Sequence, residues 1–418
     1  MNAGIGAPLS AREEWRANWP MVVAAMAGLS FASIPAATLG LFIAPLEQRF
    51  GWTRAEISFG MTIFALVSLP LAPFAGALVD RIGGRRVGLP GVAASGLAFA
   101  AFALLGGALV QWLLTWVVYS LAALGIRSVV WNTAISSAFS AGRGLAIAVV
   151  LGGLSLSQMA APPLAEFFIA NFGWRSAYLA LGLGWAGIAF VLVLAFFKVR
   201  RPATATDRGP ESAEAPALSG LTLGEAMRSL AMLRISLAIV IFGLVATGIT
   251  IHMVPMLTGN GATRAEAASL AVVLGLGSLL GNLGAGWLTD RVRSALLPLA
   301  CFALPGVGQA VLLSGTDNLA VLGFGIAALG LGAGAALQVG IYLSTRYAGL
   351  RHFGKIYGVI SSCQAGASGI GPLVVGIAYD ATQSYALVLG TALPLTALSA
   401  LLVFGLGPYP DFERRSAG

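Results

Sequence analysis

The chain has 418 residues, of which 58% are hydrophobic and only 10% are charged. A soluble domain carries about 25% charged residues to cover its surface, so this composition excludes an ordinary soluble protein. Cys301 and Cys363 both lie in apolar runs, which excludes a disulfide scaffold and a cysteine zinc site. The net charge of +8 predicts no nucleic-acid partner, because the basic residues stand at the ends of apolar runs.

Apolar runs dominate the sequence from residue 19 onward. A helix that crosses a bilayer needs about 20 mostly apolar residues, and twelve runs meet this requirement. They cover residues 19–46, 54–79, 86–107, 110–138, 143–170, 174–198, 232–257, 265–288, 294–314, 318–345, 354–379 and 383–407. We therefore predict an all-α polytopic membrane protein, a monomer with twelve transmembrane helices in the lipid bilayer.

The basic residues are distributed unevenly between the loops. If both termini lie on one side, that side holds 19 Lys and Arg residues and the other side holds 4. Cytoplasmic loops carry the excess of basic residues, so we expect both termini in the cytoplasm. The strong preference for Arg over Lys, with abundant Ala and Gly, is typical of a GC-rich bacterial genome. The expected location is therefore the bacterial inner membrane.

A repeat divides the chain into two halves. The pairs that share an offset of 210 residues include Thr53–Glu56 with Thr263–Glu266, Asp80 with Asp290, and Pro162 with Pro372. Such a repeat predicts two six-helix bundles related by an axis along the membrane normal. We place the N-terminal bundle at 1–198, a cytoplasmic linker at 199–231 and the C-terminal bundle at 232–418. The spacing of Thr222 and Glu225 predicts a capping box that starts a short helix.

The loop between the second and third spans, Gly76–Arg86, resembles the signature of the major facilitator superfamily, and Gly286–Arg291 resembles its weaker copy. Within the superfamily, the chain resembles the monocarboxylate-transporter and oxalate/formate-exchanger branch. The residues that carry this second likeness are Arg143–Ala146, Gly173–Arg175, His252–Pro255, the run from Tyr342 to Pro372, and Tyr379-Asp380. The resemblance implies the major facilitator fold and transport across the membrane.

The signature loop and its copy are also candidates for a conformational latch. The residues concerned are Gly76, Asp80, Arg81, Arg85, Arg86, Asp290 and Arg291. At the cytoplasmic end of the second helix, the Asp80 carboxylate can face a helix N-terminus and neighbouring guanidinium groups. We expect this ion pair to hold two helices together in the outward-open state and to release them in the inward-open state. The alternative is a charge cluster that only sets the topology.

Arg127 is the one basic residue that lies deep inside a span, seventeen residues from the start of 110–138 and eleven from its end. Burying a guanidinium near the midplane costs at least about 2.5–3.5 kcal/mol on insertion scales. No Asp or Glu lies at a comparable depth in the other predicted spans. An anionic substrate is therefore the expected partner of Arg127. The alternative is an Arg held by helix carbonyls and amide side chains.

The sequence departs from the resembled branch at two positions. The branch usually carries a carboxylate-binding Arg in a Gly-Arg pair on the eighth helix, where this chain has Gly281-Asn282. Some relatives carry an acidic residue on the tenth helix, where this chain has Gln338. A carboxylate substrate remains the expectation, but lactate-like substrates and the family's proton coupling do not follow from the resemblance.

Other polar residues inside the spans are candidates for the substrate cavity. They are Asn132, Gln158, His252, Asn282, Gln338, Tyr342 and Gln364. Each either lines the cavity or forms an interhelical contact that stabilises by about 0.6 kcal/mol. His252 could carry a proton with the substrate, since the ordinary pKa of histidine is about 6.5, or a backbone carbonyl could hold it in place.

The sequence contains no catalytic carboxylate pair, Ser/His/Asp set or phosphate-binding loop, so we expect neither an enzyme nor a cofactor. The preferred function is a secondary transporter of a small organic anion that works by alternating access. Its further partner would be a proton or a counter-transported anion. One alternative is an exporter of a larger amphipathic or aromatic metabolite, and another is a transport-inactive membrane sensor on the same fold.

Overall fold

The computed structural model describes residues 10–139, 141–197, 220–292, 294–349, 351–407 and 409–410. Most of the predicted linker lies outside these residues, as do Arg200, Arg201 and Arg208 of its charge count. The described end of the linker contains the short helix α10 (Leu223–Arg228). Its capping box of Thr222 and Glu225 confirms the prediction made from their spacing.

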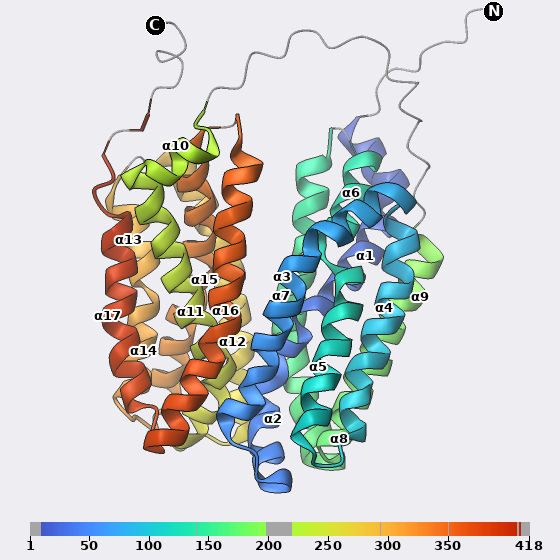
Figure 1. Ribbon diagram of the computed structural model, residues 1–418, viewed down its shortest axis with the longest axis vertical. Coiled ribbons are helices and arrows are strands. Elements are labelled where there is room, and N and C mark those ends of the chain that lie inside the picture. The colour runs from blue at the N-terminus through green and yellow to red at the C-terminus, as the bar shows by residue number, and fades with distance from the viewer. Residues whose placement is uncertain are drawn as a thin grey trace, which may run out of the picture.

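The helices form two groups that stand side by side (Figure 1). We call α1–α9 the first bundle: α1 (Ala11–Ser30), α2 (Ile34–Phe50), α3 (Arg54–Ile82), α4 (Gly84–Ala100), α5 (Leu109–Ala123), α6 (Ser128–Ala138), α7 (Arg143–Phe172), α8 (Trp174–Leu179) and α9 (Ala186–Phe196). The second bundle contains α11 (Leu230–Gly259), α12 (Arg264–Arg291), α13 (Leu296–Ala303), α14 (Pro305–Leu313), α15 (Leu319–Ala348), α16 (Phe353–Thr382) and α17 (Ala386–Val403).

Twelve helical stretches of the described chain are long and apolar enough to cross a membrane, which confirms the predicted number. Most of their ends fall within a few residues of the predicted ones. The first is longer at its start, because a capping box of Ser10 and Glu13 begins the helix before the apolar run.

Several spans contain irregular turns that the sequence did not predict. Short 3-10 segments occupy Phe31–Ser33, Ala101–Leu104 and Leu124–Ile126. A π-helical segment covers Ala180–Trp185. Such turns free backbone groups, which a membrane protein tolerates where neighbouring helices or a cavity satisfy them.

The repeat is visible in the helix boundaries. The helices α7 and α16 both span 30 residues, and both their first and last residues are 210 positions apart (353 − 143 and 382 − 172). The starts of α3 and α12 share the same offset, and each follows a Thr–Glu capping box. Equivalent capping chemistry therefore starts equivalent helices in the two halves.

The two bundles contact each other at the end of the molecule that is far from the termini, and their helices diverge toward the other end (Figure 1). We call the first the closed end, which carries residues 51–53, 260–263 and 383–385, and the second the open end, which carries residues 83, 141–142, 349 and 351–352. At the closed end, α3 packs against α16 and α7 packs against α12. A Cβ at Gly376, near this end, would overlap the backbone of Ala55, and the contact continues to the middle of α16, where a Cβ at Gly369 would overlap Ala65.

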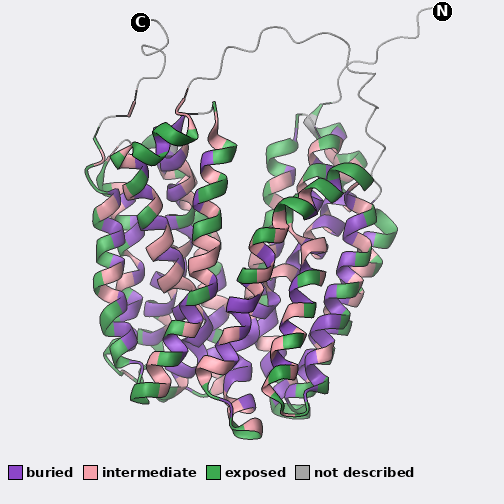
Figure 2. Cartoon of the chain, viewed as in Figure 1, coloured by how far each residue is buried: buried purple, intermediate pink, exposed green. Residues whose placement is uncertain are grey.

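The burial of side chains follows this arrangement. One hydrophobic cluster runs through the first bundle and continues into the closed end of the second, where it includes Met253, Leu257 and Tyr385. A separate cluster around Phe302 and Tyr347 belongs to the second bundle alone. Figure 2 shows that the burial of residues between the bundles increases toward the closed end, where buried residues of the two bundles lie side by side.

Candidate functional site

The fourth span is broken at Arg127. The 3-10 segment ends at Ile126, Arg127 is extended (φ −63°, ψ 157°), and α6 begins at Ser128. The indole Nε1 of Trp131 donates to the Ile126 carbonyl at 3.0 Å, which holds the break in place. The first amides of a helix have no intrahelical acceptors, so a positive helix end starts beside the Arg127 side chain.

The Arg127 guanidinium is half-buried and makes no hydrogen bond or ion pair with any residue that the structure describes. Other arginines of this protein are held by backbone carbonyls: Arg175 donates to Ala103 and Leu105, and Arg234 donates to Leu402 at 3.0 Å. One turn further along α6, the Oδ1 atom of Asn132 is buried without a hydrogen-bond partner. Near this break, therefore, one buried oxygen and one half-exposed guanidinium have no partner among the described residues.

The surroundings of α6 determine which of its sides is free. It packs against α1, α3, α4 and α7, all of the first bundle. Trp131 fills the space beside Gly28 of α1 and Gly88 of α4. Ser128, Val129 and Thr133 are exposed on the side that these helices leave uncovered.

A second group of polar residues joins the bundles at the closed end. Nε of Arg54 forms an ion pair with Glu47 at 2.8 Å, and Nη1 donates to the Tyr385 hydroxyl at 2.6 Å. The guanidinium also lies 3.6 Å from the ring centre of Tyr379. The Asp380 carboxylate accepts hydrogen bonds from the backbone N–H groups of Arg54 and Ala55 at 3.0 and 2.8 Å. The first turn of α3 is thus bound by the second bundle at the closed end.

His252 lies in the same network and is fully buried. Its Nε2 atom is 3.0 Å from both the Pro372 carbonyl and the Ser58 hydroxyl, and its Nδ1 atom is 3.0 Å from the Tyr385 hydroxyl. Ser58 belongs to the first bundle and the other partners to the second. The structure therefore places His252 at the boundary between the bundles, with a backbone carbonyl among its partners.

The repeat of Arg54 makes an equivalent contact. Arg264, at the first turn of α12, pairs with Glu166 of α7 at 3.2 Å and donates to the Leu41 carbonyl at 3.0 Å. Each Thr-Arg-Ala-Glu turn thus directs its Arg to the opposite bundle. The sequence marked the repeat but did not predict these partners, because Glu166 and Tyr385 come from distant segments and Glu47 belongs to the preceding helix, α2.

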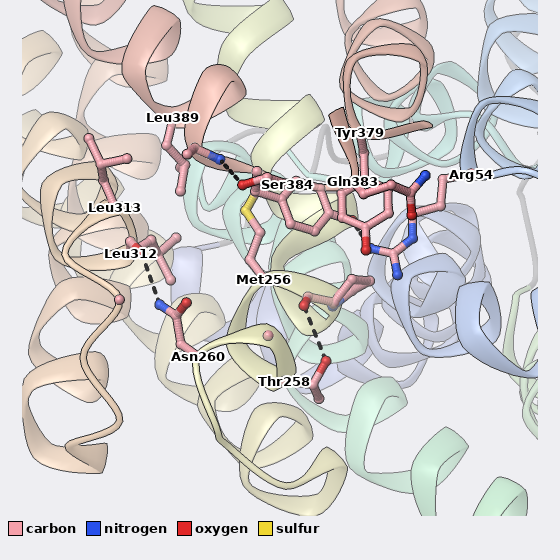
Figure 3. A pocket seen from close by; sticks show the side chains of 15 residues that line it. Arg54, Met256, Thr258, Asn260, Leu312, Leu313, Tyr379, Gln383, Ser384 and Leu389 are labelled. Carbon is pink, nitrogen blue, oxygen red and sulfur yellow. Dashed lines mark hydrogen bonds between the residues drawn. The ribbon is translucent and has the colours of Figure 1, made fainter. Parts of the chain in front are cut away.

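Figure 3 shows a cavity of about 470 Å³ beside this network. Arg54 and Tyr379 form one wall, and Met256, Asn260 and Leu312 lie opposite. The Asn260 amide is already bonded to the Leu312 carbonyl at 2.9 Å. Since Arg54 is also paired, this cavity presents no free cation to a ligand.

The remaining predicted cavity residues are spread over several helices. Gln158 lies where α7 approaches Gly275 of α12, and Asn282 is exposed on α12. Gln338 lies beside Gly286, Tyr342 beside Tyr409, and Gln364 beside Gly243. Tyr342 is hydrogen-bonded to the side chain of Tyr409, whereas Gln158, Asn282, Gln338 and Gln364 make no side-chain hydrogen bond to the described residues.

The signature loop stands at the open end. Asp80, Arg81 and Arg86 are exposed, and Asp80 makes no hydrogen bond or ion pair with a described residue. Arg85 donates to the Leu194 carbonyl at 2.9 Å within its own bundle. A Cβ at Gly76 would have nothing within 4 Å. In the weaker copy of the loop, the Arg291 guanidinium lies 4.3 Å from the ring centre of Trp287. The Asp290 side chain is outside the part of the chain that the structure describes.

Comparison with known proteins places the chain among membrane transporters. The profile of the Major Facilitator Superfamily matches residues 21–372 and 235–417. Monocarboxylate transporter 11 of Mus musculus is 28% identical over 285 residues, which are 65% of this chain and 60% of that transporter's length. The 3-(3-hydroxy-phenyl)propionate transporter of Escherichia coli K12 is 27% identical over 94% of this chain and 93% of its own.

The crystal structure of a D-xylose-proton symporter has the same fold. It matches with a TM-score of 0.71 at 14% sequence identity, over 93% of this chain and 97% of that one. These relatives and this fold are those of transporters and not of enzymes. The chain is a multi-pass membrane protein that belongs to the major facilitator superfamily and, within it, resembles the monocarboxylate-transporter branch.

Proposed function

We propose that this protein is a secondary transporter of a small organic anion, most simply a carboxylate, that works by alternating access. Arg127 is the observation that carries the proposal. It is a half-buried guanidinium without a described partner, next to the positive end of α6. Half-helix N-termini that point into a transporter cavity are a recurrent way of binding anionic groups.

The uncovered side of α6 supports this assignment. Four helices of the first bundle cover its other sides and leave one side exposed, and we assign this side to the space between the bundles. An anion there would receive a fork of guanidinium N–H donors and the first amides of α6.

The names of the relatives agree with a carboxylate. One is a monocarboxylate transporter and the other carries an arylpropionate, and both kinds of compound have a single carboxylate. The second name also keeps open the exporter of an aromatic metabolite as the alternative. The transport-inactive sensor has no observation in its favour.

The two ends of the molecule correspond to the two gates of alternating access. We infer that the structure represents the state open toward the termini, because the inter-bundle contacts lie at the closed end. The excess of basic residues on the terminal side favours the cytoplasm for that side and an inward-open assignment. The same reasoning favours the bacterial inner membrane.

The function can be tested with purified protein in liposomes. Uptake of labelled pyruvate, 3-phenylpropionate and succinate is compared with uptake of the neutral 3-phenylpropionamide, with and without a pH gradient. We expect at least one carboxylate to be transported and the amide to be ignored. Transport of the amide as fast as its acid would contradict an anion-binding site.

Replacing Asp80 with Asn should impair the transport cycle more than substrate binding. In this structure Asp80 is exposed and unpaired with described residues, as we expect of a released latch. We expect Asp80 to gain ion-pair partners only in the state in which α3 and α16 meet at the open end. Loss of its charge should therefore destabilise the outward-open state alone. Uptake and equilibrium binding are measured on one preparation, with Arg16→Gln as a control at an exposed charge of the same bundle. Normal turnover of Asp80→Asn would leave only the topological role.

A further inference from the structure

The hydrogen bonds around His252 determine its protonation state at the closed end. The Pro372 carbonyl can only accept, so the Nε2 atom, 3.0 Å away, carries a proton. The Tyr385 hydroxyl already accepts a hydrogen bond from Arg54, so its own proton is free to be donated to Nδ1. His252 is therefore neutral, with its proton on Nε2. The opposite tautomer, with its proton on Nδ1, would leave the Nε2 lone pair facing a lone pair of the Pro372 carbonyl oxygen.

A second proton on this imidazole does not fit the closed end. A proton on Nδ1 would point at the Tyr385 oxygen, which would then lie between the cations of Arg54 and His252. The hydroxyl proton of Tyr385 would lose its acceptor, because Nδ1 would no longer have a free lone pair. The charged and titratable groups around His252 offer no compensation. Glu47 is paired with Arg54, Asp380 is occupied by the backbone amides of α3, and the Tyr379 ring covers the Arg54 guanidinium.

The protonated form fits better once the bundles separate at this end. Ser58 lies on the first bundle, so separation would remove it and admit water to a side chain that is now fully buried. A hydrated imidazole takes up a proton at about pH 6.5. Because only one of the two conformations accommodates the extra proton, proton binding and opening of the closed end must favour each other.

We propose that His252 is a proton-binding site that controls this gate. The bundles close here only while the imidazole is neutral, and proton uptake stabilises the conformation that is open at this end. In the orientation proposed above, this end faces the outside of the cell, so the protons come from there. The inference requires alternating access but not the identity of the substrate, and its test needs no substrate.

The test measures the distance between the bundles at the closed end. Spin labels are placed at the exposed positions Gln48 and Asp317 by Gln48→Cys and Asp317→Cys, after Cys301→Ala and Cys363→Ala, and the protein is examined in nanodiscs. We expect the short distance to predominate at pH 8. Below about pH 6.5, the ratio of long to short distances should rise toward about tenfold per pH unit.

His252→Gln should abolish this response, because a Gln amide supplies a donor and an acceptor but takes up no proton. His352→Gln, which changes the other histidine of the chain, should keep the wild-type response. So should Arg127→Gln, which separates this inference from the anion proposal. A wild-type distance that stays constant between pH 8 and 5.5, or a His252→Gln variant that keeps the response, would overturn the proposal.

A tyrosine pair gives a second, independent comparison in case His252→Gln fails to fold. Tyr385→Phe removes the hydroxyl between Arg54 and His252, so it should lower the short-distance population at pH 8 and flatten the pH response. Tyr379→Phe keeps the ring over Arg54, and its hydroxyl has no hydrogen-bond partner among the described residues, so it should match the wild type. Identical behaviour of the two variants would also contradict the proposal.

Discussion

Arg127→Gln should abolish binding of the transported carboxylate while the protein still folds and inserts into the membrane. The guanidinium makes no bond to a described residue, so its removal leaves no protein partner unsatisfied. In the complex, however, the variant leaves a partly desolvated carboxylate without its counter-ion. Losing one partner of such a charge pair costs about 2–5 kcal/mol, which weakens binding by at least about 30-fold.

Arg127→Lys separates the charge from the shape of the side chain. Lysine keeps the positive charge but offers a point donor in place of the guanidinium fork. Losing one charge-assisted hydrogen bond costs about 1.5 kcal/mol, so this variant should bind about tenfold more weakly. Both variants are compared by the thermal shift that the wild-type substrate induces, with Arg16→Gln as the matched control. If Arg127→Gln binds as well as the wild type, Arg127 is structural and the anion assignment loses its main support.

The arrangement of spans was predictable because it depends on composition and local chemistry. Apolar run length determines the number of spans, and the Thr–Glu capping boxes at Thr53 and Thr263 determine where α3 and α12 begin. The 210-residue offset predicted that α7 and α16 would correspond, and their boundaries agree with it. These features need no knowledge of which helices meet.

The break at Arg127 was not predictable from the fourth span. Gly125 and Ser128 flank the Arg, but such small residues occur in continuous transmembrane helices as well. The break depends on tertiary contacts: Gly125 packs against Gly91 of α4, and Trp131 bonds the Ile126 carbonyl. Because the helix is broken between them, the directions of the Arg127 and Asn132 side chains do not follow from the geometry of a continuous helix.

The network at the closed end was missed for a related reason. Asp380 binds the amide of Ala55 across 325 residues of sequence, and Arg54 reaches Tyr385 across 331. No local pattern indicates such partners. His252 stood out in the sequence only as a rare titratable residue in an apolar run, which was equally consistent with the cavity and with a backbone contact. Its place at the bundle boundary comes from the packing of α3 against the second bundle.

Gly369→Leu should stop transport by preventing the closed end from forming. In this structure a Cβ at Gly369 would overlap Ala65 of the opposite bundle, and Thr62 donates to the Gly369 carbonyl at 2.8 Å. Leu favours a helix by roughly 1 kcal/mol over Gly, so α16 and its own bundle should fold normally. Uptake into liposomes should fall to background, and the labels at positions 48 and 317 should report the long distance even at pH 8. Gly390→Leu on α17 is the control, because nothing lies within 4 Å of a Cβ there.

A compensating pair distinguishes a steric effect between bundles from a defect inside one of them. Gly369→Ala adds only the Cβ that would overlap Ala65, so it should slow uptake while leaving the thermal stability of the protein near that of the wild type. Ala65→Gly removes the opposing Cβ, and the double variant should regain much of the lost uptake because the bundles can again approach. If Gly369→Leu transports like the wild type, the contact between α3 and α16 seen here is not a step of the transport cycle. Impaired Gly369→Ala without rescue by Ala65→Gly would place the defect within the second bundle instead.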